Sequence, residues 1–192
     1  MPDSPREQLL AAAVNRAAQG GISDLSLRQI AAELDTSHRM LIYHFGSKDG
    51  LLAAVSGAVE QQQRDTLAAL GADPSLTPAQ AAMQMWERFA DPSLWPFERL
   101  FFDLYAQALQ GKPHLSGFLD SVLEPWFAPT VAVQVARGMA PDAARALARL
   151  GVATTRGLLL DLLATGDRAG VDAAMRMFLD WYERAVDVGG VS

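Results

Sequence analysis

Apolar residues recur along almost the whole chain with the 3.6-residue period of an amphipathic helix, and no stretch shows the alternation that marks a strand. Glycine and proline fall mostly between the periodic segments and separate one from the next. The pattern therefore predicts an all-α protein of about nine helices. The expected helices cover residues 5–19, 26–34, 38–43, 48–70, 78–90, 94–110, 114–137, 141–164 and 171–186.

Two of the expected helices begin with a capping box, Ser4 with Glu7 and Ser26 with Gln29. In such a box the serine hydroxyl accepts a hydrogen bond from the backbone N–H three residues later. The side chain at that later position accepts one from the backbone N–H of the serine. Both sequences therefore predict well-defined helix starts.

Two prolines, Pro125 and Pro129, fall inside the apolar segment 114–137. Proline lacks an N–H group and crowds the preceding helical turn, so we expect these residues to kink or divide that helix. A glycine- and proline-containing break follows residue 70 and separates two parts of the chain. The expected organisation is a helix-turn-helix domain over 1–46, a linking helix over 47–70, and a ligand-binding and dimerisation domain over 71–192.

Composition narrows the class of protein. The chain has 192 residues, of which 50% are hydrophobic, and no cysteine. The absence of cysteine excludes disulfides, a thiol nucleophile and cysteine-ligated metals. No apolar run is long enough for a membrane helix, and residues 1–6 do not resemble the start of a signal peptide. We therefore expect a cytoplasmic protein without a membrane partner.

Neither catalytic motifs nor metal-binding spacings occur in the sequence. There is no His-Glu-x-x-His, no P-loop, no nucleophile elbow and no glycine pattern for a dinucleotide. We therefore expect no enzyme activity, no metal and no cofactor. The net charge of −6 argues against non-specific binding of nucleic acid by bulk charge, but it does not exclude a local reading surface.

The most informative segment runs from residue 27 to residue 48. Four apolar residues spaced at i, i+3, i+4 and i+7 form one buried face of a short helix; they are Leu27, Ile30, Ala31 and Leu34. A three-residue turn, Asp35–Ser37, separates this helix from a second short one. Two short helices joined in this way are typical of a helix-turn-helix.

The second short helix carries side chains suited to reading DNA. If Leu41 faces the core, Arg39 and Tyr43 point outward with Thr36 beside them, and Met40 and Ile42 lie on the flanks. Arginine binds guanine O6 and N7 through two hydrogen bonds, and an apolar side chain such as Met40 contacts the thymine methyl group. Tyrosine stacks on sugars or donates to a phosphate.

Two cations lie in the first turns of neighbouring helices, where free N–H groups also favour a phosphate. They are Arg28 and Lys48. The full set of candidate DNA contacts is Arg28, Thr36, Ser37, His38, Arg39, Met40, Tyr43, His44 and Lys48.

Residues 21–52 resemble the DNA-binding domain of the TetR family of bacterial transcriptional regulators. The similarity is carried by Gly21, by the segment 26–31, by Leu34, and above all by the segment Leu41–Leu52 with its Tyr-His-Phe-Gly-Ser-Lys run. The resemblance implies a two-domain all-α fold and a homodimer on a palindromic operator. It also implies release by a small molecule bound in the C-terminal domain, and it makes a repressor the default role.

Three residues depart from the family pattern. Ile42 replaces a phosphate-contacting tyrosine, Arg39 replaces a small residue, and Asp35 replaces the turn glycine. Aspartate adopts the left-handed conformation more readily than most residues, so the turn is retained. Residues 1–55 hold five basic residues against six acidic ones, a net charge of −1 that predicts few phosphate contacts per monomer.

The C-terminal part carries two further expectations. Aromatic residues cluster between 83 and 127; they are either core or, as the resemblance suggests, the lining of a pocket for an apolar or aromatic ligand. The candidate pocket residues are Trp86, Trp95, Phe101, Phe102, Tyr105, Trp126 and Arg156. The resemblance places a dimer interface on the last two helices, with Leu158, Leu162, Phe178 and Trp181. The alternative function is a helical dimer interaction protein with degenerate DNA binding.

Overall fold

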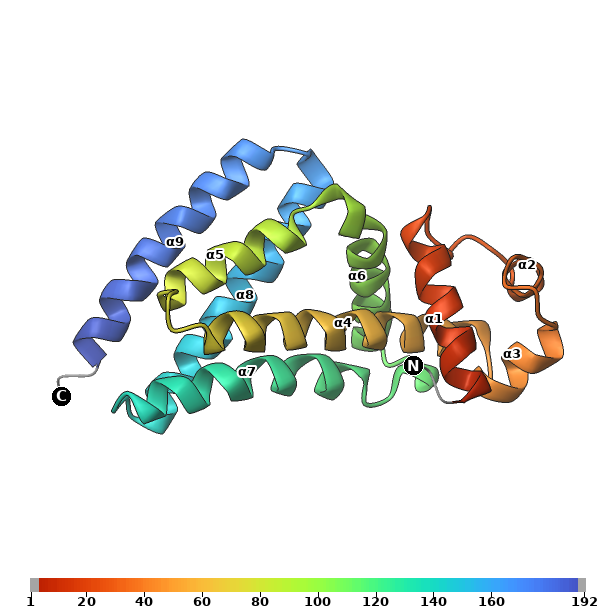
Figure 1. Cartoon of the computed structure of the whole chain (residues 1–192), viewed down its shortest axis with the longest axis horizontal. Helices are drawn as coiled ribbons and strands as arrows, with labels where there is room; N and C mark the ends of the chain where they lie inside the picture. Colours follow the sequence, from red (N-terminus) through yellow and green to blue (C-terminus); the bar gives the residue numbers. More distant parts are fainter. Residues whose placement is uncertain (1–3, 190–192) are drawn as a thin grey trace. The chain divides into compact units, whose positions relative to one another are not determined.

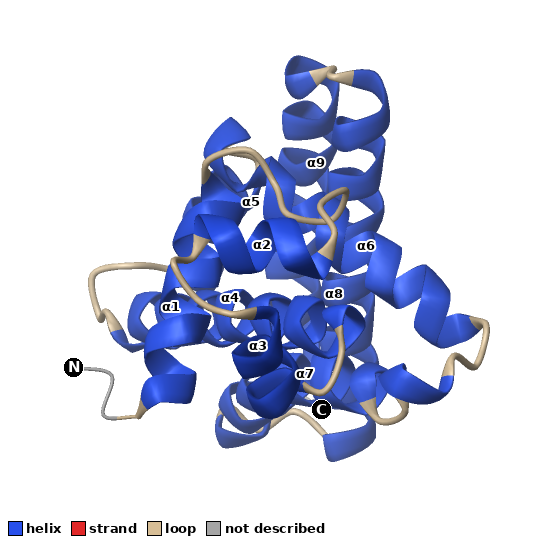
Figure 2. Cartoon of the chain, turned by 90° about the vertical axis from the view of Figure 1, so that its right-hand side faces the viewer, coloured by secondary structure: helices blue, strands red, loops and turns tan. Residues whose placement is uncertain are grey.

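The structure of the chain is a computed structural model that describes residues 4–189, except for the side chains of His114 and of residues 186–189. Over these residues the chain forms α-helices joined by short loops and turns, with no strand (Figures 1 and 2). The α-helices are α1 Pro5–Ala18, α2 Leu27–Glu33, α3 His38–Phe45, α4 Lys48–Ala72, α5 Pro78–Phe89, α6 Trp95–Leu109, α7 Phe118–Ala136, α8 Pro141–Thr165 and α9 Arg168–Gly189. Two single 3-10 turns, η1 Pro92–Leu94 and η2 Pro113–Leu115, complete the set.

The predicted all-α class is therefore confirmed, and helix boundaries differ from the sequence analysis by only a few residues. The largest shift of a helix start is in α7, which begins at Phe118 rather than at residue 114. Helix α9 begins at Arg168 rather than near residue 171. Asp167 explains the earlier start, because its carboxylate accepts a hydrogen bond from the backbone N–H of Gly170 at 2.9 Å and so caps the first turn.

One helix, α7, contains both Pro125 and Pro129. We expected these prolines to kink or divide the segment, and the helix is not divided. The two residues are four apart and share one side of the helix, so the missing N–H groups fall on the same side, where Pro129 is exposed.

Both predicted capping boxes are present. The Ser4 hydroxyl accepts from the Glu7 N–H at 3.3 Å, and the Ser26 hydroxyl accepts from the Gln29 N–H at 3.3 Å. A third box, Thr77 with Gln80, opens α5. These caps satisfy donors at the helix starts that would otherwise lack partners.

The helices group into two compact units, each described separately below. The first consists of Met1–Gln62 and Ser93–Asp120, and the second of Gln63–Pro92 and Ser121–Ser192. This grouping differs from a simple split after residue 70, because α6 belongs with the N-terminal helices while α4 contributes to both units. The functional division into a DNA-binding and a ligand-binding domain stays a prediction.

The first unit is built around the apolar faces of α1 to α4, and α6 packs against α1. Ile30 of α2, Leu41 of α3 and Leu51 of α4 are fully buried. Arg16 links α1 to α2, because its guanidinium forms an ion pair with Glu33 and donates to the Gly21 carbonyl at 3.1 Å. The core therefore fixes the orientation of the short helices α2 and α3.

In the second unit, α9 packs against α5 and α8. Polar groups join α9 to α5 and α8 to α7. The Trp86 indole N–H donates to the Asp172 carboxylate at 2.7 Å, and Arg145 makes a bidentate pair with Glu124 at 2.7 and 2.8 Å. The pair lowers the pKa of Glu124 below its ordinary value, because the Arg145 guanidinium hydrogen-bonds the ionised carboxylate.

Candidate nucleic-acid interface

The turn between α2 and α3 has the geometry that the sequence predicts. Asp35 adopts the left-handed conformation, with φ of 50°. The Thr36 N–H donates to the Ala31 carbonyl at 2.9 Å, which closes the C-terminal end of α2. Ser37 then caps α3, and its hydroxyl accepts from the Met40 N–H at 3.2 Å. The two short helices are therefore held at a fixed angle by local hydrogen bonds and by their shared core.

Leu41 is the residue of α3 that faces the core, with none of its surface exposed. Tyr43 is 78% exposed, and Arg39 is also exposed. Met40 and Ile42, on either flank, are 38% and 39% exposed. The projection made from the sequence is thus correct for the direction of these side chains, while their contact with DNA stays a prediction.

Three cationic or titratable side chains near this face make no hydrogen bond or ion pair with the described part of the chain. They are Arg28, His38 and Arg39, and all three are exposed. Arginine without an internal partner is available to phosphate or to a guanine edge at no cost in lost contacts. Thr36 is half-buried at the start of the same face, and Ser37 is exposed.

Lys48 and His44 are engaged within the unit. The Lys48 ammonium group donates to the Ser23 carbonyl, in the loop before α2, and the side chain is half-buried. The Nε2 atom of His44 is buried. The His44 ring meets the Tyr43 ring edge-on at 4.9 Å between centroids. His44 Nε2 is therefore not exposed in this structure, and a contact of His44 with a phosphate stays a prediction.

Two residues that support α3 were not identified from the sequence pattern. Arg6 of α1 donates from Nε to the His44 carbonyl at 3.4 Å, and its guanidinium lies over the Phe45 ring, 5.1 Å from the centroid. Gly50 of α4 lies so close to α3 that a Cβ atom there would be 2.1 Å from the Phe45 carbonyl oxygen. Periodicity carries no signal for either contact, because Arg6 and His44 are 38 residues apart in the sequence and the Gly50 contact depends on how the chain turns between α3 and α4.

The predicted pocket residues divide between the two units. Trp95, Phe101, Phe102 and Tyr105 belong to the first, and Trp86, Trp126 and Arg156 to the second. Phe101 packs in the first unit against neighbouring rings, among them Phe118 at 6.2 Å. In the second, Arg156 donates to the Val122 carbonyl. Trp86, Phe101 and Trp126 are buried core side chains, whereas the other four are half-buried. The role of all seven toward a ligand stays a prediction.

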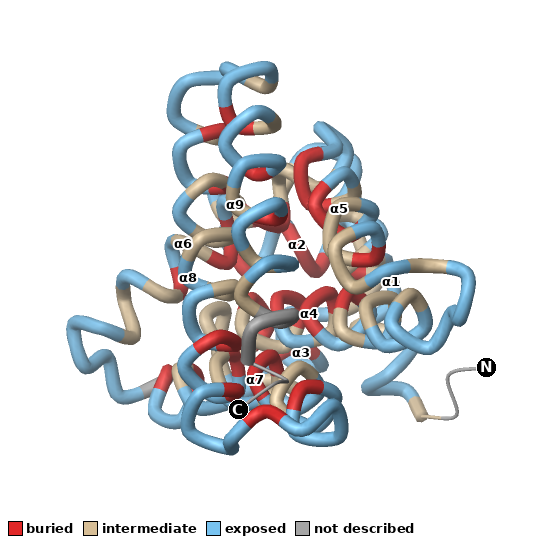
Figure 3. The backbone as a smooth tube through the Cα atoms, turned by 90° about the vertical axis from the view of Figure 1, so that its left-hand side faces the viewer, coloured by how far each residue is buried: buried red, intermediate tan, exposed pale blue. Residues whose placement is uncertain are grey.

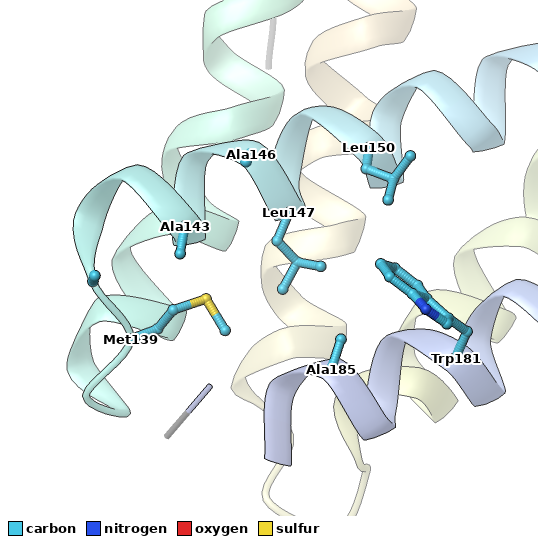
Figure 4. Close-up of a pocket in the computed structure, with 8 residues that line it drawn as sticks. Met139, Ala143, Ala146, Leu147, Leu150, Trp181 and Ala185 are labelled. Atoms are coloured by element: carbon cyan, nitrogen blue, oxygen red, sulfur yellow. The ribbon is translucent and has the colours of Figure 1, made fainter. Parts of the chain in front are cut away.

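An apolar groove of about 500 Å³ lies elsewhere in the second unit, between the start of α8 and the end of α9. The side chains of Met139, Leu147 and Trp181 point toward one another across it (Figure 4). The remaining lining is apolar as well and consists of Ala140, Ala143, Ala146, Leu150 and Ala185. Trp181, expected at a dimer interface, is the single sequence-predicted site residue among them.

The predicted dimer residues differ in accessibility. Trp181 is 44% exposed, whereas Leu158 and Phe178 are half-buried. Leu162 is fully buried within the single chain, and the role of all four residues in an interface stays a prediction. Among the described side chains of α8 and α9, the large apolar ones that are exposed are Leu150, Leu160, Met177 and Trp181, and much of α9 before residue 186 is exposed (Figure 3).

Two chemical possibilities receive no support from the described residues. No group of three or more His, Cys, Asp or Glu side chains gathers there in a way that could hold a metal ion. None of the helices described here combines the length and hydropathy that crossing a bilayer requires.

A buried α2–α3 pair with an exposed, arginine-bearing second helix defines a helix-turn-helix protein with the fold of a DNA-binding regulator. Comparison with known proteins narrows this class. The model of the family described as "Bacterial regulatory proteins, tetR family" matches residues 9–55. This match shows that residues 9–55 have the sequence of the DNA-binding region of that family, and solved structures, reported next, share the fold of the whole chain.

Similar solved structures cover nearly the whole chain. A TetR transcriptional regulator from Legionella pneumophila superposes with a TM-score of 0.68 at 19% identity, over 93% of this chain and 97% of the other. The multidrug binding protein EbrR, solved with imidazole, gives 0.66 at 27% identity, over 93% and 94%. A TetR variant from Acinetobacter baumannii in complex with minocycline gives 0.65 at 18% identity, over 99% and 100%. Comparison of the sequence with curated proteins found no significant match.

Proposed function

We propose that this protein is a transcriptional repressor that binds a palindromic operator as a homodimer in the cytoplasm and leaves it when a small apolar or aromatic molecule binds. The proposal refines the class of DNA-binding regulator to which the fold belongs. The observation that carries it is the outer surface of α3, where Arg39 and Tyr43 are exposed on a helix fixed by the fully buried Leu41.

The reading surface has the chemistry that base recognition requires. Arg39 has no partner within the described chain and sits in the first turn of α3, the part of a recognition helix that meets base edges. Ser37 and Thr36 place hydroxyl groups beside it, and Arg28 adds a free cation at the start of α2. Phosphate contacts from Arg28 and Lys48 would fix the position of the unit on the duplex, while Arg39 would specify sequence.

Exposed apolar residues on α8 and α9 support a homodimer. Leu150 and Leu160 of α8 are 43% and 52% exposed, and Met177 of α9 is 74% exposed. Ala153 and Gly157 lie between the two leucines on the same side of α8 and are exposed as well. Small residues between large ones let two helices approach closely. Burial of the large apolar side chains in a dimer removes them from water, which is favourable.

Ligand release is supported by the similar proteins and by the composition of the second unit. EbrR is described as a multidrug binding protein, and the Acinetobacter baumannii variant was solved with minocycline. Here the aromatic residues Trp86, Trp126 and Phe89 gather in the second unit, with the Phe89 and Trp126 rings 5.8 Å apart. Such surroundings favour an apolar or aromatic molecule over a strongly charged one.

The proposed mechanism is a coupling between two binding events. A dimer places its two recognition helices in successive major grooves, about 34–36 Å apart on one face of B-DNA. A ligand that binds better to a dimer with another spacing shifts the population away from the operator-bound form. Operator binding must weaken ligand binding by the same factor.

The experiment that tests the proposal is selection of bound duplexes from a random library at near-physiological salt. The expected result is an enriched palindrome with half-sites about one helical turn apart. Arg39→Ala should weaken the selected operator by about 1–3 kcal/mol and relax preference at one base pair of each half-site. Arg176→Ala is the matched control, because Arg176 is an exposed arginine on α9. Equal behaviour of the two variants would contradict the assignment of Arg39.

A helical interaction protein with degenerate DNA binding is the second candidate. The observation that favours it is the net charge of −1 in residues 1–55, together with the apolar exposure of Met40 and Ile42. The two candidates differ in their response to salt. A regulator binds duplex DNA with an affinity that falls as salt rises. An unenriched library with no salt-dependent binding would favour the interaction protein.

A further inference from the structure

The exposed surface of α3 is more apolar than the rest of the surface formed by residues 4–62. Between residues 4 and 62, the large hydrophobic side chains that are exposed to solvent are Met40, Ile42 and Tyr43. All three lie within four consecutive positions of α3, and Leu41 between them is the buried anchor. Apolar side chains gathered on one exposed surface indicate a contact that removes them from water.

The types of side chain on α3 limit which bases this helix can recognise. The helix sequence is His-Arg-Met-Leu-Ile-Tyr-His-Phe, without asparagine, glutamine, aspartate or glutamate. Adenine is usually read by the paired donor and acceptor of an amide, and cytosine by a carboxylate that accepts from its amino group. Neither group is present on α3. What remains on the exposed side of α3 is the Arg39 guanidinium for the guanine acceptors, apolar surface for the methyl group of thymine, and the single polar groups of His38 and Tyr43.

The positions of these side chains around α3 determine the order in which they meet bases along the DNA. Successive residues of a helix are rotated by about 100°, so Met40 and Ile42 lie on opposite flanks of the outward direction shared by Arg39 and Tyr43. Their similar exposure, 38% and 39%, agrees with two equivalent flanking positions. When Arg39 points at a base edge, the two apolar side chains are therefore directed to either side of that base.

We propose that each operator half-site contains a guanine read by Arg39 with a neighbouring thymine on each side, and that Met40 and Ile42 read the thymines by packing on their C5-methyl groups. The inference rests on the proposed DNA-binding function and names the half-site that it recognises. It also accounts for specific binding by residues 1–55, which have a net charge of −1. Few phosphate contacts provide little affinity, and apolar contacts with the bases supply part of the remainder.

Single-atom changes in the DNA test each contact. The probe is the operator obtained from the library selection, with one thymine at a time replaced by deoxyuridine, which lacks only the C5-methyl group. Loss of a methyl packed on Met40 or Ile42 should weaken binding about 4-fold, the factor expected for burial of one such group. Replacing the central guanine by 7-deazaguanine removes the N7 acceptor and should weaken binding about 5-fold or more.

Protein variants assign each thymine to a side chain. In Ile42→Ala the deoxyuridine penalty should vanish at one thymine and persist at the other, and Met40→Ala should show the reverse. Leu109→Ala is the matched control, because Leu109 is 66% exposed in the same unit but lies on α6. All three side chains are exposed, so the variants should unfold at nearly the wild-type temperature, which circular dichroism checks.

The outcomes separate this inference from the function on which it rests. A selected half-site without thymine beside the guanine would overturn the inference and leave the regulator proposal standing. So would deoxyuridine penalties that are absent in the wild type, or unchanged in both alanine variants. Absence of any sequence-specific duplex binding would overturn the proposed function and this inference together.

Discussion

Gly50 shows how a single residue is fixed by a backbone contact. It lies in the first turn of α4, where its N–H donates to the Ser47 hydroxyl at 2.9 Å. A Cβ atom would fall 2.1 Å from the Phe45 carbonyl oxygen, far inside normal contact distance. The obstacle is backbone rather than the flexible end of a side chain. The junction between α3 and α4 therefore requires glycine at this position.

Gly50→Ala should lower the free energy of unfolding by about 3 kcal/mol, because the backbone of α3 or α4 must move to admit the methyl group. The helix-forming advantage of alanine offsets only about 0.5–1 kcal/mol of this loss. Gly57→Ala is the matched control in the same helix, where a Cβ atom would meet nothing within 4 Å. Urea unfolding should show the control slightly stabilised, and equal effects of the two substitutions would contradict the close approach.

Lys48 and Arg28 form a second comparison at the scale of the residue. Lys48→Ala removes the bond to the Ser23 carbonyl, so it should cost about 1 kcal/mol of stability and also weaken binding to all DNA sequences alike. Arg28 makes no contact within the described chain, so Arg28→Ala should change stability by less than about 0.5 kcal/mol.

Each of these two variants should reduce the slope of log affinity against log salt by about 0.9, the value for one lost phosphate contact. Thermal unfolding and salt titrations of duplex binding measure the two effects separately. An unchanged salt slope in Lys48→Ala would mean that this lysine only joins α4 to the loop before α2.

At the scale of the element, Tyr182 shows how α9 is joined to α7. The Gln134 amide donates to the Tyr182 hydroxyl at 3.2 Å. Burial raises the pKa of Tyr182 above its ordinary value near 10, and the hydrogen bond from Gln134 opposes this effect only in part. The phenol of the folded protein therefore stays neutral at a pH at which the phenol of the unfolded chain ionises.

The sign of the pH dependence follows from this difference. Stability from the neutral Tyr182 is complete below the unfolded pKa near 10 and is lost as the pH rises through the folded pKa. Tyr182→Phe should cost about 1 kcal/mol at neutral pH, from the lost hydrogen bond, but should lose less further stability than the wild type above pH 10. Urea unfolding across this range measures both effects.

Tyr43→Phe serves as the control for this pH series, because Tyr43 is 78% exposed. Its alkaline loss of stability should match that of the wild type. If Tyr182→Phe also followed the wild-type curve, another group would be responsible for the alkaline instability.

At the scale of the whole molecule, the proposed dimer places the exposed side of α8 against a second copy. Leu160→Glu introduces a charge at a residue that is 52% exposed in the monomer. Burying that charge without a partner is unfavourable, so the variant should dissociate to monomers and lose operator affinity while remaining folded. Sedimentation and circular dichroism measure assembly and fold independently.

Leu109→Glu is the matched control for the dimer, since Leu109 is 66% exposed on α6 and lies outside the proposed interface. This variant should keep the assembly state of the wild type. A Leu160→Glu protein that remains dimeric would require the interface to lie elsewhere.

The sequence by itself determined the class of fold and the direction of the α3 side chains. Helical periodicity and the capping boxes are local signals, and local hydrogen bonds complete the turn at Asp35 and Thr36. Placing Leu41 in the core was enough to orient Arg39 and Tyr43, because the geometry of one helix fixes the angles between its side chains.

Only the tertiary structure decided which groups are accessible. It buried Leu162 and the Nε2 atom of His44, joined Lys48 to the Ser23 carbonyl, and placed Arg6 over Phe45. These outcomes depend on helices far apart in the sequence packing against one another. A periodic pattern shows that a helix has a buried face but does not show which partner covers it, and for that reason the contacts between helices could not be predicted.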